Sequence, residues 1–319
     1  MIKENTLSLV VLAAGLGTRF GGNKQLEQFS NKNLSLMECN ICHAIDAGFI
    51  QVIFVIRPEL KILFDKQIVP KFKGKIDVSF VYQSLSDLPD NTEISKNRVK
   101  PLGTAHAIWC CRKIIKNNFV VINADDYYGQ SAFTLLKKQN DITPKDYAMV
   151  AYQLDKTLSD FGHVNRGFCQ YSANFILKSI KECTNIYKEN DTIMGHIEHS
   201  SASISTHSTV LDANSLTSMN CWLFSIDIFK RLDNFIQTTF NQKNVSLTTE
   251  CYLPSAVMFE IESFDRKVHV LTSQNQWFGL TYQDDIPLVE KNIQQLADLQ
   301  QFSTLTTHSR NQTELMTPF

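Results

Sequence analysis

The chain has 319 residues, of which 43% are hydrophobic and 20% are charged, and its formal net charge is -1. This composition is typical of a globular protein with a full core, and it excludes a collagen-like, disordered or disulfide-framework chain. Because the chain has no block of five or more like charges, it offers little support for electrostatic binding of nucleic acid or of an anionic membrane.

The N-terminal sequence MIKENTLSLVVLAAG has one lysine and one acidic residue before a short apolar run. It lacks the positively charged N-terminal region and the length of a signal peptide. No apolar run in the chain approaches the roughly 20 residues of a membrane-spanning helix. Eight scattered cysteines fit reduced thiols better than a disulfide framework. We therefore expect a cytoplasmic protein that binds neither nucleic acid nor membranes.

The first part of the chain alternates predicted strands with predicted helices. The continuous apolar run at 7–13 is typical of a strand covered on both faces, and the segment 34–47 has helical spacing that ends at Gly48. Further strands are predicted at 51–56, 77–83 and 119–123, and further helices at 58–69 and 104–116. This alternation predicts an α/β fold with a doubly wound, mainly parallel, Rossmann-like sheet.

The pattern changes after about residue 145, where strand-like runs follow one another with few helices between them. We interpret the Ser- and His-rich segment 184–217 as a long loop or lid, and we expect a final helix at 285–299. The resulting prediction is one domain over 1–300, with halves at about 1–145 and 146–300, the second of them a mixed-sheet extension. A polar tail follows at 301–319.

A glycine-rich loop, LAAGLGTRFGGNKQ, follows the first strand at 12–25. A Walker loop would need Lys followed by Ser or Thr after the second glycine, but Asn23 precedes Lys24 and Gln25 follows it. A dinucleotide fingerprint fits poorly too, since Arg19 stands where the backbone should approach a pyrophosphate closely. Two cations beside backbone N–H groups would instead suit a triphosphate whose P–O bond is being broken.

The loop resembles the L-A-A-G-x-G-T-R…K signature of the sugar-1-phosphate nucleotidyltransferases. The resemblance implies a nucleotide-diphospho-sugar transferase-like fold, with a nucleotide-binding first half and an acceptor-binding second half. It implies an enzyme that condenses an NTP with a sugar 1-phosphate to give an NDP-sugar and pyrophosphate, with Arg19 and Lys24 on the nucleotide phosphates. The other loop residues implied in nucleotide binding are Ala13, Ala14, Gly15, Gly17 and Thr18.

Two further segments of the first half resemble the nucleotide site of this family. LGTAHA (102–107) resembles the motif that holds the nucleobase in uridylyltransferases, and implies a nucleobase contact for Gly103 and Thr104. Gln83 resembles the glutamine that pairs with the edge of the base, so UTP is favoured. The insertion 84–100 between them departs from the family pattern and could alter base choice. The hydroxyl of Thr104 could also serve as a helix N-cap.

The segment NADDYYG (123–129) follows a predicted strand and so places its acids at the carboxyl end of the sheet. The resemblance implies that Asp125 is the ligand of Mg²⁺, which prefers carboxylate and phosphate oxygens, while Asp126 shapes the turn. Many relatives carry a second metal-binding aspartate where this chain has Gly279. Either another carboxylate substitutes, with Asp284, Asp285 and Glu250 as candidates, or one protein carboxylate holds the metal.

Three residues of the second half resemble the acceptor site of the family: Gly162 in FGHVNRG, Glu182 in KECTNI and Asn220 in SMNCWLF. The glutamate and the asparagine would bind sugar hydroxyls. Two alternatives stay open. One is a cytidylyltransferase for phosphocholine or another phosphorylated alcohol, which would need an aromatic cage for a quaternary ammonium. The other is a catalytically silent nucleotide-binding regulatory protein.

Two other motifs suggest metal or cofactor binding, but their context favours a simpler interpretation. CNICH (39–43) matches a haem attachment motif, but it falls within a predicted amphipathic helix, so we interpret its thiols as buried. His196 and His199 lie near His207 in a segment without helical pattern, where solvated histidines are expected.

Overall fold

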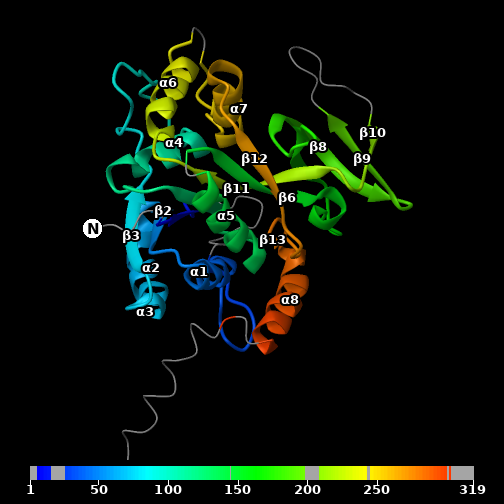
Figure 1. The fold of residues 1–319 in the computed structure, drawn as a ribbon. Coiled ribbons are helices and arrows are strands. Elements are labelled where there is room, and N and C mark those ends of the chain that lie inside the picture. Colours follow the sequence, from blue (N-terminus) through cyan, green and yellow to red (C-terminus); the bar gives the residue numbers. More distant parts are fainter. Residues whose placement is uncertain are drawn as a thin grey trace, which may run out of the picture.

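The fold is described from a computed structural model, shown in Figure 1. The structure describes residues 6–15, 26–143, 145–197, 208–242, 245–299 and 302. Four of the predicted site residues, Gly17, Thr18, Arg19 and Lys24, lie outside the described residues, as do His199, His207 and nearly all of the predicted tail. Among the described residues, no helix combines the length and the apolar character needed to cross a membrane.

One eleven-stranded sheet runs through both halves of the chain, in the order β10-β9-β8-β7-β11-β4-β1-β2-β3, with β6 paired to β11 and to β12. Strands β4, β1, β2 and β3 are parallel, as predicted, while β11 is antiparallel to β4. A separate ribbon pairs β5 (Asp126–Tyr127) with β13 (Phe278–Gly279). The sheet strands are β1 (Ser8–Leu12), β2 (Gln51–Ile56), β3 (Asp77–Tyr82), β4 (Phe119–Asn123), β6 (Tyr147–Gln153), β7 (Val164–Tyr171), β8 (Leu177–Glu189), β9 (Thr192–Ile197), β10 (Thr209–Leu211), β11 (Leu216–Phe224) and β12 (Val268–Thr272).

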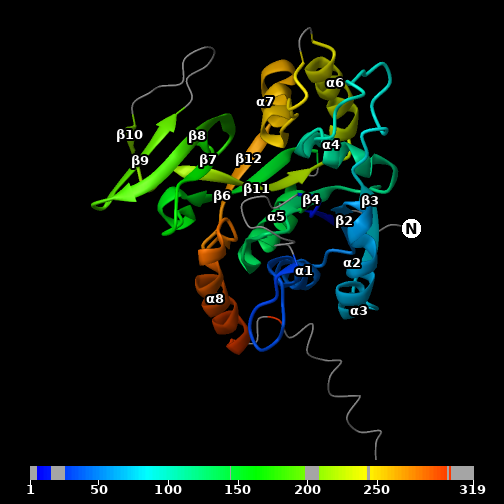
Figure 2. The ribbon, with the colours of Figure 1, turned by 180° about the vertical axis from the view of Figure 1, so that it is seen from behind.

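Helices cover both faces of the parallel part of the sheet, as Figures 1 and 2 show from opposite sides. Leu9 and Val11 of β1 pack into the hydrophobic cluster of one face, and Val10 packs into that of the other. This two-sided burial explains the continuous apolar run. The helices are α1 (Leu36–Asp46), α2 (Lys61–Gln67), α3 (Val69–Phe72), α4 (Thr104–Trp109), α5 (Gln130–Ile142), α6 (Ile228–Phe240), α7 (Leu253–Phe264) and α8 (Ile286–Asp298), with 3-10 turns η2 (Pro58–Leu60), η3 (Cys110–Lys113), η4 (Leu154–Thr157) and η5 (Gln283–Asp285).

The prediction of a loop over 184–217 is wrong for its described parts. Strand β8 continues to Glu189, a turn leads into β9, and β10 pairs with β9. These strands form a small antiparallel extension with a buried side around Cys183, Ile186 and Leu211. Their other side is polar and exposed, so the Ser, Thr and Asn residues hid the alternation that identifies such strands.

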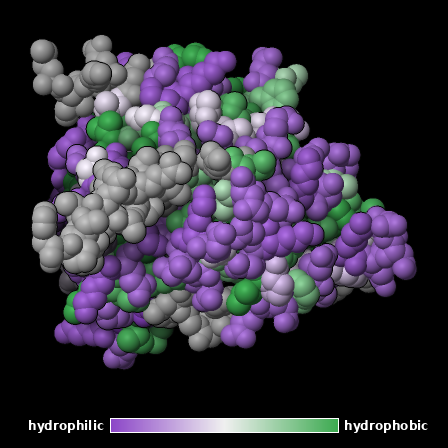
Figure 3. All heavy atoms as spheres, turned by 90° about the horizontal axis from the view of Figure 1, so that it is seen from below, coloured by the Kyte–Doolittle hydropathy of each residue, from purple (hydrophilic) through white to green (hydrophobic). Residues whose placement is uncertain are grey.

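The prediction of few helices in the second half is also wrong, since α6 and α7 lie there. The signal for α6 was present, because Ile228, Leu232, Ile236 and Phe240 recur every four residues and are all buried. On the face seen in Figure 3, hydrophilic side chains dominate and the apolar ones among the described residues are scattered.

Burial of His43 in α1 makes the stability of the protein sensitive to acid. The ring is fully buried, its Nε2 lies 2.9 Å from the Tyr127 hydroxyl, and burial lowers the pKa of His43 to about 4. The unfolded chain would bind a proton at this residue near pH 6.5, so stability is lost as the pH falls from 6.5 toward 4.

We expect the loss in unfolding free energy between pH 7 and pH 4.5 to be about 2 kcal/mol smaller in His43→Phe than in the wild type. Urea unfolding at the two pH values measures it. Parallel pH dependence in the two proteins would mean that His43 does not stay neutral in the fold.

Candidate active site

A cavity of about 670 Å³ lies at the carboxyl ends of the parallel strands and is lined by residues from both halves of the chain. From the first half, Ala13 and Gly15 follow β1, and Asp125 follows β4. From the second half, Glu182 of β8 and Asn220 of β11 face the same space. Open α/β sheets bind ligands at this edge, so the fold brings these five predicted residues together.

The two adjacent acids of NADDYYG both reach the cavity, but they are held differently. The backbone oxygen of Asp125 accepts a hydrogen bond from the Leu280 N–H at 3.0 Å. The Asp126 carboxylate accepts from Asn123 Nδ2 at 2.8 Å, and its backbone oxygen accepts from Asn40 Nδ2 at 2.6 Å. The turn that carries both acids is therefore anchored to α1, to β4 and to the segment after β13.

The carboxylate of Asp126 occupies the space that a side chain at position 279 would need. Gly279 lies opposite Asp126 in the β5–β13 ribbon, and a Cβ atom there would be 2.4 Å from Asp126 Oδ1. A carboxylate is therefore present at this position despite the glycine, because Asp126 supplies it from the opposite strand of the ribbon. Sequence reasoning gave Asp126 only a role in the turn.

The sequence candidates for a substitute carboxylate do not line this cavity. Asp285 is buried, and its Oδ2 accepts hydrogen bonds from the N–H groups of Thr281 and Tyr282 at 2.8 and 2.7 Å. Glu250 forms an ion pair with Lys100, and Asp284 is exposed at η5. In the described structure, Asp285 and Glu250 are engaged in contacts outside this cavity.

We expect Gly279→Ala to shift the Asp126 carboxylate, whose end can rotate away from the new methyl group, and to lower stability moderately, because the methyl group would also lie 3.0 Å from the ring of buried Trp277. A displaced carboxylate beside a metal ligand typically weakens metal binding about tenfold. The measurement is the magnesium concentration that gives half-maximal pyrophosphate release, with thermal unfolding as the check on folding. An unchanged magnesium requirement would exclude Asp126 from the metal site.

The residues at this edge fit a magnesium ion. Asp125 and Asp126 offer carboxylate oxygens to the cavity, and no group of three or more His, Cys, Asp or Glu side chains in the described part of the chain could form a complete metal cage. Magnesium in nucleotide enzymes is commonly held by one or two carboxylates together with substrate phosphates and water. The donor set is therefore suited to a metal that arrives with a nucleotide.

On the acceptor side, Asn220 has an uncommon backbone conformation, with φ at 62°. It lies in an irregularity of β11 between Ser218 and Cys221, where its side chain turns toward the cavity. Its Nδ2 donates to Asn123 Oδ1 at 2.7 Å and its Oδ1 accepts from Trp222 Nε1 at 3.0 Å. Asparagine tolerates this left-handed region better than most residues, so local geometry supports this choice of residue.

Gly162 does not line the cavity. A Cβ atom at this position would lie 2.7 Å from the ring of Tyr282, whose hydroxyl donates to the His163 backbone oxygen at 2.8 Å. The glycine therefore permits close packing of the loop before β7 on the segment before α8. The acceptor role implied by the resemblance receives no support from this placement.

Gln83, Gly103 and Thr104 form a connected group at the start of α4. The Gln83 Nε2 donates to the Gly103 backbone oxygen at 2.9 Å and lies 3.3 Å from His106 Nδ1. Of the three, only Thr104 lines the cavity. Its hydroxyl is not the N-cap of its own helix, since Gly103 holds that position. It accepts instead from the Leu253 N–H of α7 at 2.8 Å.

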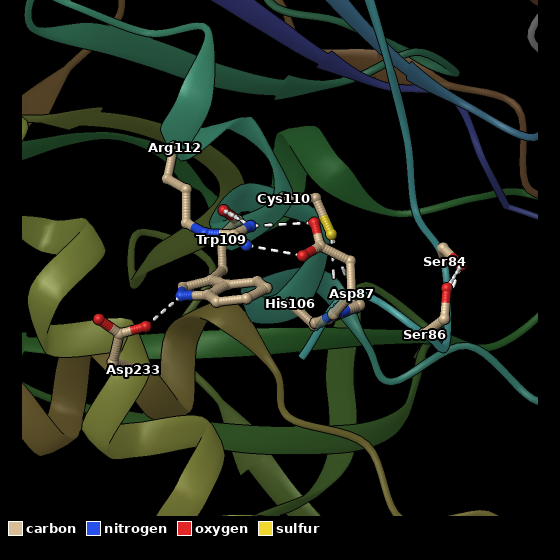
Figure 4. A network of polar contacts seen from close by, with 8 residues as sticks. All are labelled: Ser84, Ser86, Asp87, His106, Trp109, Cys110, Arg112 and Asp233. Atoms are coloured by element: carbon tan, nitrogen blue, oxygen red, sulfur yellow. Dashed lines mark hydrogen bonds and ion pairs between the residues drawn. The ribbon is translucent and has the colours of Figure 1, made fainter. Parts of the chain in front are cut away.

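The insertion 84–100 packs on α4 through the polar network in Figure 4. The Asp87 carboxylate accepts from both terminal nitrogens of Arg112 at 2.6 and 3.0 Å, and the guanidinium lies 3.2 Å from the centre of the Trp109 ring. The Asp87 backbone oxygen is 2.6 Å from His106 Nε2. Because a carbonyl only accepts, this nitrogen carries the hydrogen and Nδ1 is left to accept from Gln83. The insertion thus fixes the tautomer beside the predicted base-reading residue.

Sequence reasoning missed Arg166, which lies in FGHVNRG, a motif interpreted only for its glycine. This half-buried arginine of β7 lines the main cavity and also a small neighbouring cavity of about 60 Å³. Burial lowers the pKa of Arg166 to about 10, against the opposing effects of Asp126, Glu182 and Asp285. Its guanidinium lies 5.0 Å from the centre of the Trp277 ring.

Comparison with known proteins shows the family of the chain. The model of the nucleotidyl transferase family matches residues 8–188, a segment that includes β1 and most of β8. The chain belongs to the nucleotidyl transferase family. The match confirms the resemblance seen in the sequence, and it includes Asp125 and Glu182.

Solved structures share the fold of this nucleotidyl transferase at low sequence identity. The inositol-1-phosphate CTP transferase of T. maritima has a TM-score of 0.59 at 12% identity, over 95% of this chain and 98% of that one. HddC of Yersinia pseudotuberculosis has a TM-score of 0.54 at 15% identity, over 90% and 100%. A putative glucose-1-phosphate thymidylyltransferase of Bacillus anthracis has a TM-score of 0.58 at 11% identity, over 91% and 96%. No curated protein sequence matches the chain.

Proposed function

We propose that the protein is a magnesium-dependent nucleotidyltransferase that joins an NTP, with UTP favoured, to a sugar 1-phosphate. The products would be an NDP-sugar and pyrophosphate. The observation that supports this proposal most directly is the shared cavity, in which Asp125 at the end of β4 faces Glu182 and Asn220 of the second half. A nucleotide and a hydroxyl-rich acceptor would meet there beside a carboxylate.

In the proposed reaction an oxygen of the acceptor phosphate attacks the α-phosphorus of the NTP in line. The bond from that phosphorus to the oxygen bridging the β-phosphate breaks, and pyrophosphate leaves with the electron pair. No general base is needed, because the attacking phosphate is already an anion. The chain's contribution is then positioning and charge stabilisation, with Arg19 and Lys24 on the departing phosphates. Magnesium, when held by Asp125, would neutralise phosphate charge.

The structure gives the two alternatives less support. A phosphocholine acceptor would need an open aromatic face for its quaternary ammonium. Of the aromatic residues in the described lining, Tyr252 and Trp277, the second already has the Arg166 guanidinium over its ring. A silent protein was suggested by the glycine at 279, but Asp126 places a carboxylate at that point.

The test is pyrophosphate release from a panel of four NTPs, each with several sugar 1-phosphates and with phosphocholine, with and without magnesium. We expect magnesium-dependent release with a sugar 1-phosphate and UTP. The names of the structural neighbours mention CTP and thymidylyl transfer, so CTP and dTTP belong in the panel. Release with phosphocholine alone would favour the alternative acceptor, and no release with any pair would contradict the proposal.

A further inference from the structure

Arg166 is held rigidly by backbone carbonyl groups. The Thr157 oxygen accepts from both Nε, at 3.2 Å, and Nη2, and the Asn165 oxygen accepts from Nη1 at 2.8 Å. A guanidinium has five N–H groups, so each terminal nitrogen keeps one N–H that no described residue accepts. These bonds fix the plane of the group at the cavity wall.

None of the ion pairs among the described residues includes this guanidinium, although Asp126, Glu182 and Asp285 are its charged neighbours. Asp285 uses its own oxygens on Ser159 and on the backbone of the η5 turn. The described groups that accept hydrogen bonds from this half-buried cation are neutral carbonyl groups, so none of these bonds is charge-assisted on the acceptor side. An anionic group of a ligand would complete its coordination.

A second donor without an acceptor lies beside Arg166. The indole Nε1 of Trp277 is buried and has no hydrogen-bond partner, while the ring lines the same two cavities as Arg166. Buried indole N–H groups are normally satisfied. Two incompletely satisfied donor groups therefore occur side by side at the junction of the two halves.

The position of Arg166 identifies the anion. Arg166 lines the same cavity as Asp126, at the strand end where the nucleotide phosphates and the metal would lie, and as Glu182, which would bind acceptor hydroxyls and lies opposite Gly167 on the neighbouring strand β8. The group of the acceptor that lies between these two points is its phosphate. The geometry points to Arg166 as the residue that holds the phosphate of the acceptor. This inference rests on the proposed function.

The two remaining N–H groups suit a phosphate monoester, which has three terminal oxygens. Arg166 would hold two of them, and the third would stay free to attack the α-phosphorus. A lysine offers a point charge on a flexible stem and fixes no plane, so it would keep the charge but lose the bidentate contact. Acceptors without a phosphate would gain nothing from Arg166.

The experiment compares Arg166→Gln and Arg166→Lys with the wild type, using the sugar 1-phosphate that is most active in the panel. We expect Arg166→Gln to raise the KM for that acceptor by about thirtyfold, with the KM for the NTP changed by less than about twofold. The KM of Arg166→Lys for the acceptor is expected to lie between the values of the wild type and Arg166→Gln. Equal changes in both KM values, or none, would overturn the inference. Arg57→Gln is the matched control, because its guanidinium pairs with exposed Glu59 outside the cavity.

A binding measurement tests the role of Arg166 independently of enzymatic activity. Inorganic phosphate is titrated calorimetrically into protein saturated with pyrophosphate, which would occupy Arg19 and Lys24. We expect phosphate binding to be at least about tenfold weaker in Arg166→Gln than in the wild type and unchanged in Arg57→Gln. Equal phosphate affinity in all three proteins, or no binding by the wild type, would overturn the inference. Arg166-dependent phosphate binding without pyrophosphate release from any pair would instead contradict only the proposed function.

Discussion

Asp125→Asn is expected to lower the rate of pyrophosphate release by about a thousandfold while leaving the fold intact. The residue is partly exposed, and one of its structural bonds is made by its backbone oxygen with the Leu280 N–H. An asparagine can keep that bond, whereas it removes the negative charge that would hold a metal. Loss of several kcal/mol of charge stabilisation in the transition state corresponds to a rate loss of this size.

The measurement is steady-state pyrophosphate release at several magnesium concentrations, together with urea unfolding. Asp155→Asn is the matched control, because Asp155 is exposed on η4 and does not line the cavity. A rate in Asp125→Asn within about tenfold of the wild type at saturating magnesium would remove Asp125 from the metal site. If both variants lose activity equally, the loss does not come from the metal site.

Gly103→Ala should give the largest loss of stability among the substitutions considered. Gly103 has φ and ψ angles of 103° and 179°, a region that is essentially limited to glycine. A Cβ atom would also lie 2.5 Å from the Cys251 backbone oxygen, which accepts from the Ala105 N–H at 3.0 Å. Because the obstacle is backbone, it cannot rotate away. We expect a loss of at least about 3 kcal/mol in the free energy of unfolding.

Urea unfolding measures this loss, and Gly15→Ala provides the comparison. No described atom lies within 4 Å of a Cβ at position 15, so its stability should stay within about 0.5 kcal/mol of the wild type. Similar stability of Gly103→Ala and the wild type would show that the contact with Cys251 relaxes at little cost. Activity is a separate readout, since Gly103 also anchors the amide of Gln83.

The parallel half of the fold could be predicted because its signals are local. The apolar run at β1 and the spacing in α1 each reflect burial of neighbouring residues, and the acids after β4 follow from the end of a strand. The antiparallel extension could not be predicted in this way, because β8 and β9 bury only one side and expose many polar residues. Local composition there resembles that of a loop.

The candidate site was predictable where a residue acts from its own segment. Asp125, Glu182 and Asn220 were identified from sequence, and the structure brings them to one cavity. The partnership of Asp126 with Gly279 depends on a ribbon between segments that are far apart in the sequence. Nothing in either segment alone signals that contact. Arg166 was missed for a related reason, since its anchors in Thr157 and Asn165 become visible only when β7 is folded.

The side-chain amide of Gln83 has a consequence for the choice of nucleotide. Both hydrogens of its nitrogen are directed inward, to the Gly103 oxygen and to His106 Nδ1, so the carbonyl oxygen is the atom it can offer to a ligand. If this oxygen meets the middle of a base edge, it complements the ring N–H of uracil, thymine or guanine. Cytosine and adenine present a lone pair at that point and would be repelled. The enzyme would then prefer the keto bases uracil, thymine and guanine, rather than pyrimidines as a class.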